Sequence, residues 1–304
     1  MARRCPRSFA PPIIASTTSQ RSSAGGNALS LSKPYSDEQI AAAAKRARRS
    51  IIEMTHAAAS GHPGGSLSAV EIVAALYLRV LRHDPASPTW PDRDRFILSK
   101  AHAVPVLYAF LAECGYLPFE ELLTFRRLGS RLQGHSKAWS VPGVEMSGGS
   151  LGQGLSYSIG QCLAARLDGR DYRVYCLLGD GELDEGQCWE AAMAAAHYGL
   201  ANLTAVVDRN GIQNDGFVKD IMGTEPLADK WRAFGWQVQE VDGHDQRQVI
   251  EALERTKQAT GCPSVIIAHT VKGKGVSFME NNPAWHGKGP NAEERARALA
   301  DIGE

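Results

Sequence analysis

The sequence predicts an α/β fold, a doubly wound and mostly parallel sheet with helices on both faces. Apolar runs that suit buried strands alternate with amphipathic segments of helical length. The clearest unit is residues 174–213, where an apolar run, a Gly-Asp-Gly turn, a helical segment and a second apolar run follow one another. This order is typical of two parallel strands joined by a crossover helix.

The elements before this unit are expected to be mainly helical. Ser36 to Gln39 fits a capping box, and an apolar face then continues along one helix until Ser60-Gly61. Further helices are expected over residues 66–80, 103–114, 118–128 and 151–167. Residues 134–150 are too rich in Gly, Ser and Pro for regular structure and are expected to form a loop.

Within the unit, the crossover helix has apolar residues spaced for one buried face, and Gly199 suits its carboxyl end. These four residues are expected in the core rather than against a ligand: Trp189, Ala192, Met193 and Ala196. After the unit we expect strands over 236–241 and 264–269, helices over 227–234 and 246–260, and a charged helix from about Asn291. We expect residues 36–304 to form one domain.

Composition excludes several classes of function. The 304 residues include 33 basic and 33 acidic side chains, a balance that gives no support for a nucleic-acid or membrane-surface partner. No apolar run approaches the roughly 20 residues that a membrane-spanning helix needs. The six cysteines form no C-x-x-C pair, and several lie in apolar segments. We therefore expect buried, reduced thiols in a cytoplasmic protein.

Residues 1–35 differ from the rest of the chain. They are rich in arginine and serine, and the first acidic residue is Asp37. A transit peptide has such a composition, and organelle targeting is the alternative to a cytoplasmic location. Because no sustained amphipathic pattern is present, we favour a disordered extension or a start codon assigned too early.

Two polar residues at strand ends predict a metal site. Asp180 and Asn210 each follow an apolar run, so they are expected at the carboxyl ends of neighbouring strands, where open α/β sheets hold ligands. A carboxylate, a carboxamide oxygen and a nearby backbone carbonyl suit Mg²⁺ or Ca²⁺, and the flanking glycines leave N–H groups for a phosphate. Asp-Gly alone is common as a turn, but the paired Asn210 favours metal-assisted diphosphate binding.

Four of the nine histidines lie in glycine-rich or loop-like segments, where function is concentrated. They are His62, His102, His135 and His286. Imidazoles of this kind can donate hydrogen bonds and move protons near neutral pH. The other five are assigned a structural or surface role: His56, His83, His197, His244 and His269.

Two further basic segments are not assigned to the site. The segment "TVKGKG" (270–275) lacks the complete phosphate-loop spacing, so its lysines are expected in solvent. Arg126, Arg127 and Arg131 are expected at an exposed helix end.

The motifs together resemble one family. The pair "GDGELDEG" and "DRNGIQ" resembles the thiamine-diphosphate motif, and "SGHPGGSLS", "DRFILSKAHA", "PGVEMSGGSLGQGLS" and "WHGKGP" accompany it. From about Ser36 to Pro290 the chain is similar to the amino-terminal half of transketolase. The resemblance implies a thiamine-diphosphate-binding domain of the diphosphate-anchoring type.

The resemblance also implies roles for individual residues. Asp180, Asn210 and the carbonyl of Ile212 would hold the cation, and the Gly181 N–H would contact the diphosphate. Three further residues complete the cofactor set: Gly149 and Leu151 at the aminopyrimidine, and Glu185 at the interface with the partner half, linked to cofactor activation. Ser150 departs from the family, since many relatives have proline there, and we expect only a small change in loop stiffness.

The four loop histidines receive roles in the same way. His62 and His286 would approach the reacting carbons and the donor carbonyl, and His286 would also border the cofactor. His102 would contact the diphosphate and lie close to the substrate. His135 would bind the terminal hydroxyl of the donor sugar.

The resemblance implies the amino-terminal subunit of a split transketolase. Such an enzyme transfers a two-carbon ketol unit between sugar phosphates and would need a carboxy-terminal subunit with the pyrimidine-binding domain, in an α₂β₂ assembly. Two alternatives remain open. One is a subunit of a deoxyxylulose-phosphate synthase-like or 2-oxo acid dehydrogenase-like enzyme, and the other is a non-catalytic cofactor-binding module.

Overall fold

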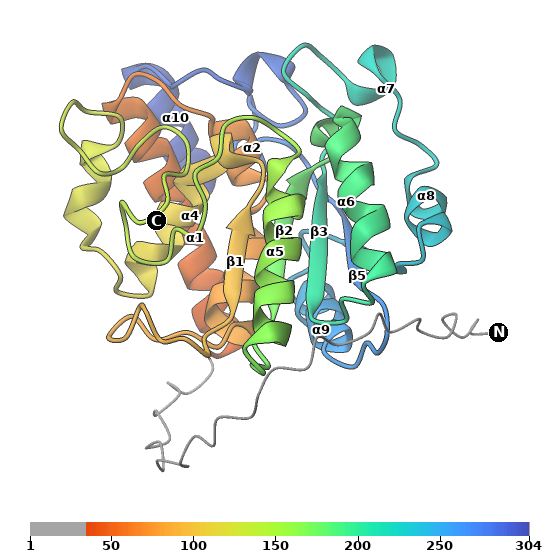
Figure 1. Cartoon of the computed structure of the whole chain (residues 1–304). Coiled ribbons are helices and arrows are strands. Elements are labelled where there is room, and N and C mark those ends of the chain that lie inside the picture. The colour runs from red at the N-terminus through yellow and green to blue at the C-terminus, as the bar shows by residue number, and fades with distance from the viewer. Residues whose placement is uncertain (1–34, 304) are drawn as a thin grey trace.

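The computed structural model describes residues 35–303, and its centre is a five-stranded parallel sheet (Figure 1). The strand order is β1-β2-β3-β5-β4, and every neighbouring pair is parallel. The strands are β1 (Arg95–Leu98), β2 (Val174–Gly179), β3 (Leu203–Arg209), β4 (Gln237–Asp242) and β5 (Ser264–His269). Residues 1–34, where the sequence predicts a disordered or targeting-like extension, lie outside the residues that the structure describes.

Helices connect the strands and cover both faces of the sheet. They are α1 (Asp37–Ala57), α2 (Pro63–Leu67), α3 (Val70–Ala75), α4 (Val104–Glu113), α5 (Gln153–Leu167), α6 (Gly186–His197), α7 (Val218–Ile221), α8 (Leu227–Ala233), α9 (Gln246–Thr256) and α10 (Ala292–Ile302). The predicted capping box at Ser36 is confirmed, and a second one begins α10 at Asn291.

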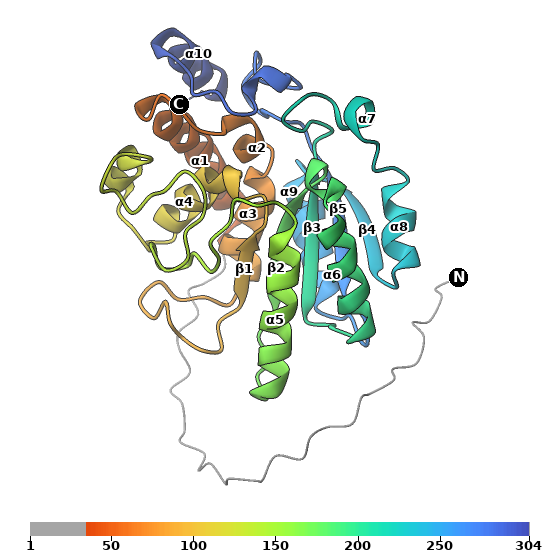
Figure 2. The same cartoon turned by 45° about the horizontal axis from the view of Figure 1, so that its top comes forward.

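The core is divided by the sheet because successive strand residues point to opposite faces. In β2, Tyr175 and Leu177 pack with α1, α3, α4 and α9, whereas Val174, Cys176 and Leu178 pack with α5, α6 and α8. Figure 2 shows the two helical layers on either side of the strands. The predicted doubly wound α/β fold is confirmed.

Several local predictions were wrong. No strand was expected at β1, whose four residues are too few for a clear periodic signal. The helix expected over 66–80 begins earlier, at Pro63, and is divided into α2, α3 and a π-helical turn over 76–80. The segment 118–128 forms only a 3₁₀ helix over 119–124. On α6, Ala192 is buried as expected, but Met193 is 57% exposed.

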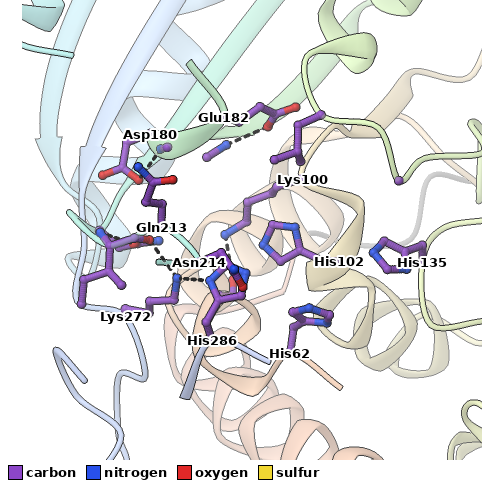
Figure 3. Close-up of a pocket in the computed structure, with 17 residues that line it drawn as sticks. His62, Lys100, His102, His135, Asp180, Glu182, Gln213, Asn214, Lys272 and His286 are labelled. Carbon is purple, nitrogen blue, oxygen red and sulfur yellow. Dashed lines mark hydrogen bonds between the residues drawn. The ribbon is translucent and has the colours of Figure 1, made fainter. Parts of the chain in front are cut away.

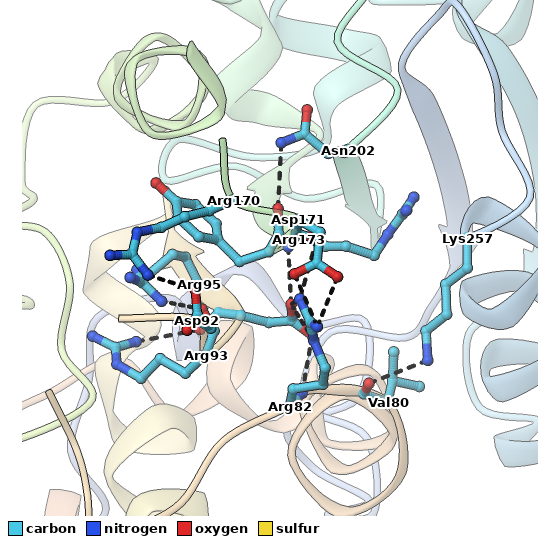
Figure 4. Close-up of polar contacts among 12 residues, drawn as sticks. Val80, Arg82, Asp92, Arg93, Arg95, Arg170, Asp171, Arg173, Asn202 and Lys257 are labelled. Atoms are coloured by element: carbon cyan, nitrogen blue, oxygen red, sulfur yellow. Dashed lines mark hydrogen bonds and ion pairs between the residues drawn. The ribbon is translucent and has the colours of Figure 1, made fainter. Parts of the chain in front are cut away.

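A polar network closes the amino ends of the strands, far from the loops that carry the predicted site (Figure 4). Arg82 pairs with Asp94 and Asp171. Asp94 is buried and also accepts from the Arg173 N–H at the start of β2, at 2.8 Å. Arg173 in turn donates to the carbonyl of Ala201, at 3.0 Å. This end of the sheet is therefore used for structure, and the carboxyl ends are left for ligands.

Over residues 35–303, no helix combines the length and the apolar character needed to cross a membrane. The thiols of Cys162, Cys176 and Cys188 are buried, as expected. Burial raises the pKa of Cys162 to about 12, so this thiol stays protonated at neutral pH.

Candidate functional site

A cavity of about 240 Å³ lies at the carboxyl ends of the strands (Figure 3). It is lined by residues that follow β1, β2, β3 and β5 and by residues of the loop before α5. The structure brings ten of the eleven predicted site residues to this cavity: His62, His102, His135, Gly149, Leu151, Asp180, Gly181, Asn210, Ile212 and His286. Glu185 is the exception, and it is exposed at the start of α6.

The oxygen-bearing residues form one side of the cavity. Gly179 of β2 is paired with Asp208 of β3, so the residues that follow these strands lie side by side. The Asp180 carboxylate accepts hydrogen bonds from the Gly181 N–H at 2.9 Å and from the Gly211 N–H at 2.6 Å. The Asn210 Oδ1 accepts from the Ile212 N–H at 3.1 Å. The two strand ends are thus joined through Asp180 itself.

Gly181 is required by the close approach of these two loops. A Cβ atom at this position would lie 2.6 Å from the Cβ of Gln213, well inside van der Waals contact. Any larger residue would push the loop after β2 away from the loop after β3, and the oxygens would separate.

Two carboxylates are buried beneath this surface, with 3% of Asp180 and none of Asp208 exposed. Burial, with the neighbouring Asp208 charge adding to it, raises the pKa of Asp180 to about 6. Burial opposes the charge of Asp208 as well, but the Lys100 ammonium and several hydrogen bonds hold its pKa below the ordinary value. Asp180 thus forms no ion pair among residues 35–303, although the Lys272 ammonium and two backbone N–H groups oppose the rise of its pKa.

The opposite side of the cavity is a cluster of imidazoles. The ring centre of His62 is 5.1 Å from that of His102, 5.4 Å from that of His286 and 5.8 Å from that of His135. Burial lowers the pKa of His62 to about 4 and that of His286 to about 3. At neutral pH both rings are uncharged, so each has one nitrogen that donates and one that accepts.

His62 has an unused hydrogen-bonding atom. Its Nδ1 is buried and has no hydrogen-bond partner among the described residues. Buried polar atoms are nearly always paired. Figure 3 shows the His62 ring beside the other imidazoles of the cavity, so the side chain belongs to the site although its Nδ1 is itself shielded from solvent.

The prediction that the lysines of residues 270–275 lie in solvent was wrong for Lys272. This side chain is 2% exposed, and its Nζ donates to the Ile212 carbonyl at 2.8 Å and contacts the His286 Nδ1 at 2.7 Å. Lys274 is partly exposed, with an ion pair to Glu280. Lys272, in the segment after β5, therefore brings a positive charge into the site. It links His286 on the imidazole side of the cavity to Ile212 on the oxygen side.

Arg127 and Arg131 are exposed as predicted, but they lie in the loop after the 3₁₀ helix over 119–124 and not at a helix end; for Arg126 the predicted exposure was wrong. Arg126 is only partly exposed and donates to the Ser60 hydroxyl at 2.8 Å. Its charge is among the causes that lower the pKa of His62 and of His135. It thus acts on the site at a distance, without lining the cavity.

Three further buried residues support the site and were missed: Lys100, Glu182 and Asp208. Lys100 follows β1 and donates to the Gly65 carbonyl at 2.7 Å. Glu182 accepts from the N–H groups of Gly152, at 2.9 Å, and Gly179, at 3.0 Å, and so ties the loop before α5 to the end of β2. Charged residues inside otherwise apolar motifs were the available signal.

Acid is expected to destabilise the folded chain through the buried histidines. His62 has a pKa of about 4 when folded and an ordinary value near 6.5 when unfolded, so the unfolded chain binds more protons between these values. The free energy of unfolding should therefore decrease as the pH falls from about 6.5 to 4, by roughly 1–3 kcal/mol for this residue after solvent screening. Chemical denaturation across this range would measure it.

The matched variants for this pH series are His62→Gln and, as the control, His197→Gln on the exposed surface of α6. His62→Gln should flatten the pH dependence, and His197→Gln should leave it unchanged. Equal slopes for His62→Gln and the unsubstituted chain would contradict the expectation.

Comparison with known proteins agrees with this geometry. Residues 39–303 match the family described as transketolase, thiamine diphosphate binding domain. The chain is 48% identical to the 6-deoxy-6-sulfo-D-fructose transketolase subunit SqwG of a Clostridium species, over 80% of this chain and 88% of that protein. It is 44% identical to an apulose-4-phosphate transketolase subunit of Actinobacillus succinogenes, over 88% of this chain and 98% of that protein.

Solved structures show the same relationship. The transketolase of Campylobacter jejuni superposes with a TM-score of 0.83 at 34% identity, over 88% of this chain and 43% of that one. The chain therefore spans less than half of such a full-length transketolase. On these grounds the chain belongs to the transketolase family, where it corresponds to the thiamine-diphosphate-binding, amino-terminal domain.

Proposed function

We propose that this chain is the amino-terminal subunit of a two-subunit transketolase, which transfers a two-carbon ketol unit from a ketose phosphate to an aldose phosphate. The observation that carries the proposal is a single cavity with hard oxygen ligands on one side and uncharged imidazoles on the other. Relatives named as transketolase subunits, which this chain matches over most of their length, support the two-subunit form.

The residues present fit a divalent cation and a diphosphate. Asp180, Asn210 and the Ile212 carbonyl offer a carboxylate, an amide oxygen and a backbone oxygen, a set suited to Mg²⁺ or Ca²⁺. The Asp180 carboxylate is buried and forms no ion pair among the described residues, so a divalent ion would favour its charged form. Lys272 lines the same cavity and suits the negative charge of a diphosphate. The Gly181 N–H donates to Asp180 in the structure, and we propose that it contacts the diphosphate once a cation holds the Asp180 carboxylate.

When bound, thiamine diphosphate supplies the stabilised carbanion that breaks and forms the carbon–carbon bond. The residues of this chain bind, orient and move protons around it. His62 would approach the reacting carbons, and His286 would approach the donor carbonyl. His135 would hold the terminal hydroxyl of the donor, and His102 would face the diphosphate.

The chain would need a partner to complete the site. The cavity of about 240 Å³ is smaller than the ~300–1,000 Å³ of typical small-molecule sites. Glu185 is exposed at the start of α6, and Met193 is exposed further along the same helix. We propose that a carboxy-terminal subunit with the pyrimidine-binding domain docks there, in an α₂β₂ assembly of the cytoplasm, and that Glu185 takes part in cofactor activation.

The proposal is tested by reconstitution. Ketol transfer is assayed for the chain alone and for its mixture with the complementary subunit, with thiamine diphosphate and Mg²⁺ and with the cation removed by EDTA. Transfer is expected only when both subunits and the cation are present. Full transfer by the chain alone would overturn the two-subunit form. Pyruvate decarboxylation without an aldose acceptor would point to another class of thiamine enzyme.

A further inference from the structure

Asp208 is a fully buried carboxylate next to the site that does not line the cavity. It lies in β3, two residues before Asn210, and its Oδ2 accepts from the Asn210 Nδ2 at 3.0 Å and from the Ser68 hydroxyl at 2.6 Å. The Lys100 ammonium and the Thr270 hydroxyl also donate to it. Four segments of the chain thus meet on one side chain.

Contacts at both ends, with Asp208 and with the Ile212 N–H, decide which way the Asn210 amide faces. An ionised carboxylate can only accept hydrogen bonds, so Asp208 must be met by the NH₂ end of the amide. The oxygen end is then directed away from Asp208, toward the Ile212 N–H at 3.1 Å, where the proposed cation ligands lie. An amide that turned by 180° would present its NH₂ group to the cation instead of its oxygen.

We infer that Asp208 is a positioning residue for the divalent cation, which it never contacts, because it holds the Asn210 carboxamide with its oxygen toward the cation site. The inference rests on the proposed function, since it requires Asn210 to bind a cation. Ser68, Lys100 and Thr270 hold the carboxylate itself in place, so the amide is oriented by a group that is fixed from several sides. Outer-shell contacts of this kind commonly affect metal affinity by about 10–100-fold.

The test measures cation affinity rather than turnover. Binding of Mn²⁺ in the presence of thiamine diphosphate is followed by electron paramagnetic resonance, on the full chain with its complementary subunit. In Asp208→Asn the amide oxygen stays toward the Lys100 ammonium and the Ser68 hydroxyl, which donate to the same atom as Asn210, so the Asn210 NH₂ group keeps only a neutral and weaker acceptor. The dissociation constant for Mn²⁺ is expected to rise about 10–100-fold.

Glu145→Gln is the matched control, because Glu145 is also a buried carboxylate in an ion pair, with Arg93, but does not line the cavity. It should leave Mn²⁺ affinity unchanged. If Asp208→Asn does not fold, Thr270→Val is used instead. This substitution removes one hydrogen bond to the Asp208 carboxylate but leaves its ion pair with Lys100, so a smaller rise in the dissociation constant for Mn²⁺ is expected.

The inference is overturned if the folded Asp208→Asn variant, or Thr270→Val in its place, binds Mn²⁺ as the unsubstituted complex does. An unsubstituted complex that binds neither Mn²⁺ nor thiamine diphosphate would refute the proposed function itself. The two failures are therefore distinguishable.

Discussion

Asp180→Asn should abolish cation-dependent binding of thiamine diphosphate. The substitution keeps the shape of the side chain but removes the buried charge that faces the cation site. The loss of affinity should exceed the ~100-fold upper range of outer-shell changes, because a direct ligand is altered. Isothermal titration of thiamine diphosphate in the presence of Mg²⁺ would measure it. Ketol transfer by the reconstituted complex should fall in parallel.

The same variant makes a second prediction, about stability. Without ligands the substituted chain should be close to the original in stability, because removal of a buried charge is offset by the loss of one of the two backbone hydrogen bonds that the Asp180 carboxylate accepts. The gain in stability on adding Mg²⁺ and thiamine diphosphate, about 2.7 kcal/mol at a hundredfold excess over the dissociation constant, should disappear. Asp184→Asn, an exposed carboxylate on the same turn, is the control and should keep the gain. A ligand-induced gain retained in Asp180→Asn would exclude Asp180 as a ligand.

His62→Ala should lower kcat/KM for ketol transfer by about 10²–10⁴-fold, the range expected when a group that moves a proton is removed. The Nδ1 of His62 has no hydrogen-bond partner among the described residues, so its removal breaks no hydrogen bond of that atom within them. The diphosphate side of the cavity, with Asp180 and Lys272, is untouched. Thiamine diphosphate should therefore bind the variant almost as it binds the unsubstituted chain. Steady-state kinetics of the complex and cofactor titration would separate the two effects.

His56→Ala is the matched control for this prediction. His56 lies on α1 and its Nδ1 contacts the Pro290 carbonyl at 2.9 Å, a contact outside the cavity. Its loss should affect stability more than turnover. Unchanged turnover in His62→Ala would instead favour a cofactor-binding module without a catalytic role for these histidines.

Local patterns were sufficient for most of the fold. Residues 174–178 predict a buried strand because they are uniformly apolar, and the structure buries them on both faces of the sheet. Ser36 predicts the start of α1 because capping depends on residues only three positions apart. The Gly-Asp-Gly turn and Asn210 predict a shared site because parallel strands joined by a helix place their carboxyl ends together. Each inference uses short-range geometry.

The sequence by itself therefore determined the α/β class, the strand ends that carry Asp180 and Asn210, and the family. Only the tertiary structure decided the strand order, the burial of Lys272 and the four contacts on Asp208. The partners of these residues come from segments up to 140 positions away in the chain. Periodicity and capping report on neighbours in sequence, whereas the burial of a charge depends on which distant segments fold around it.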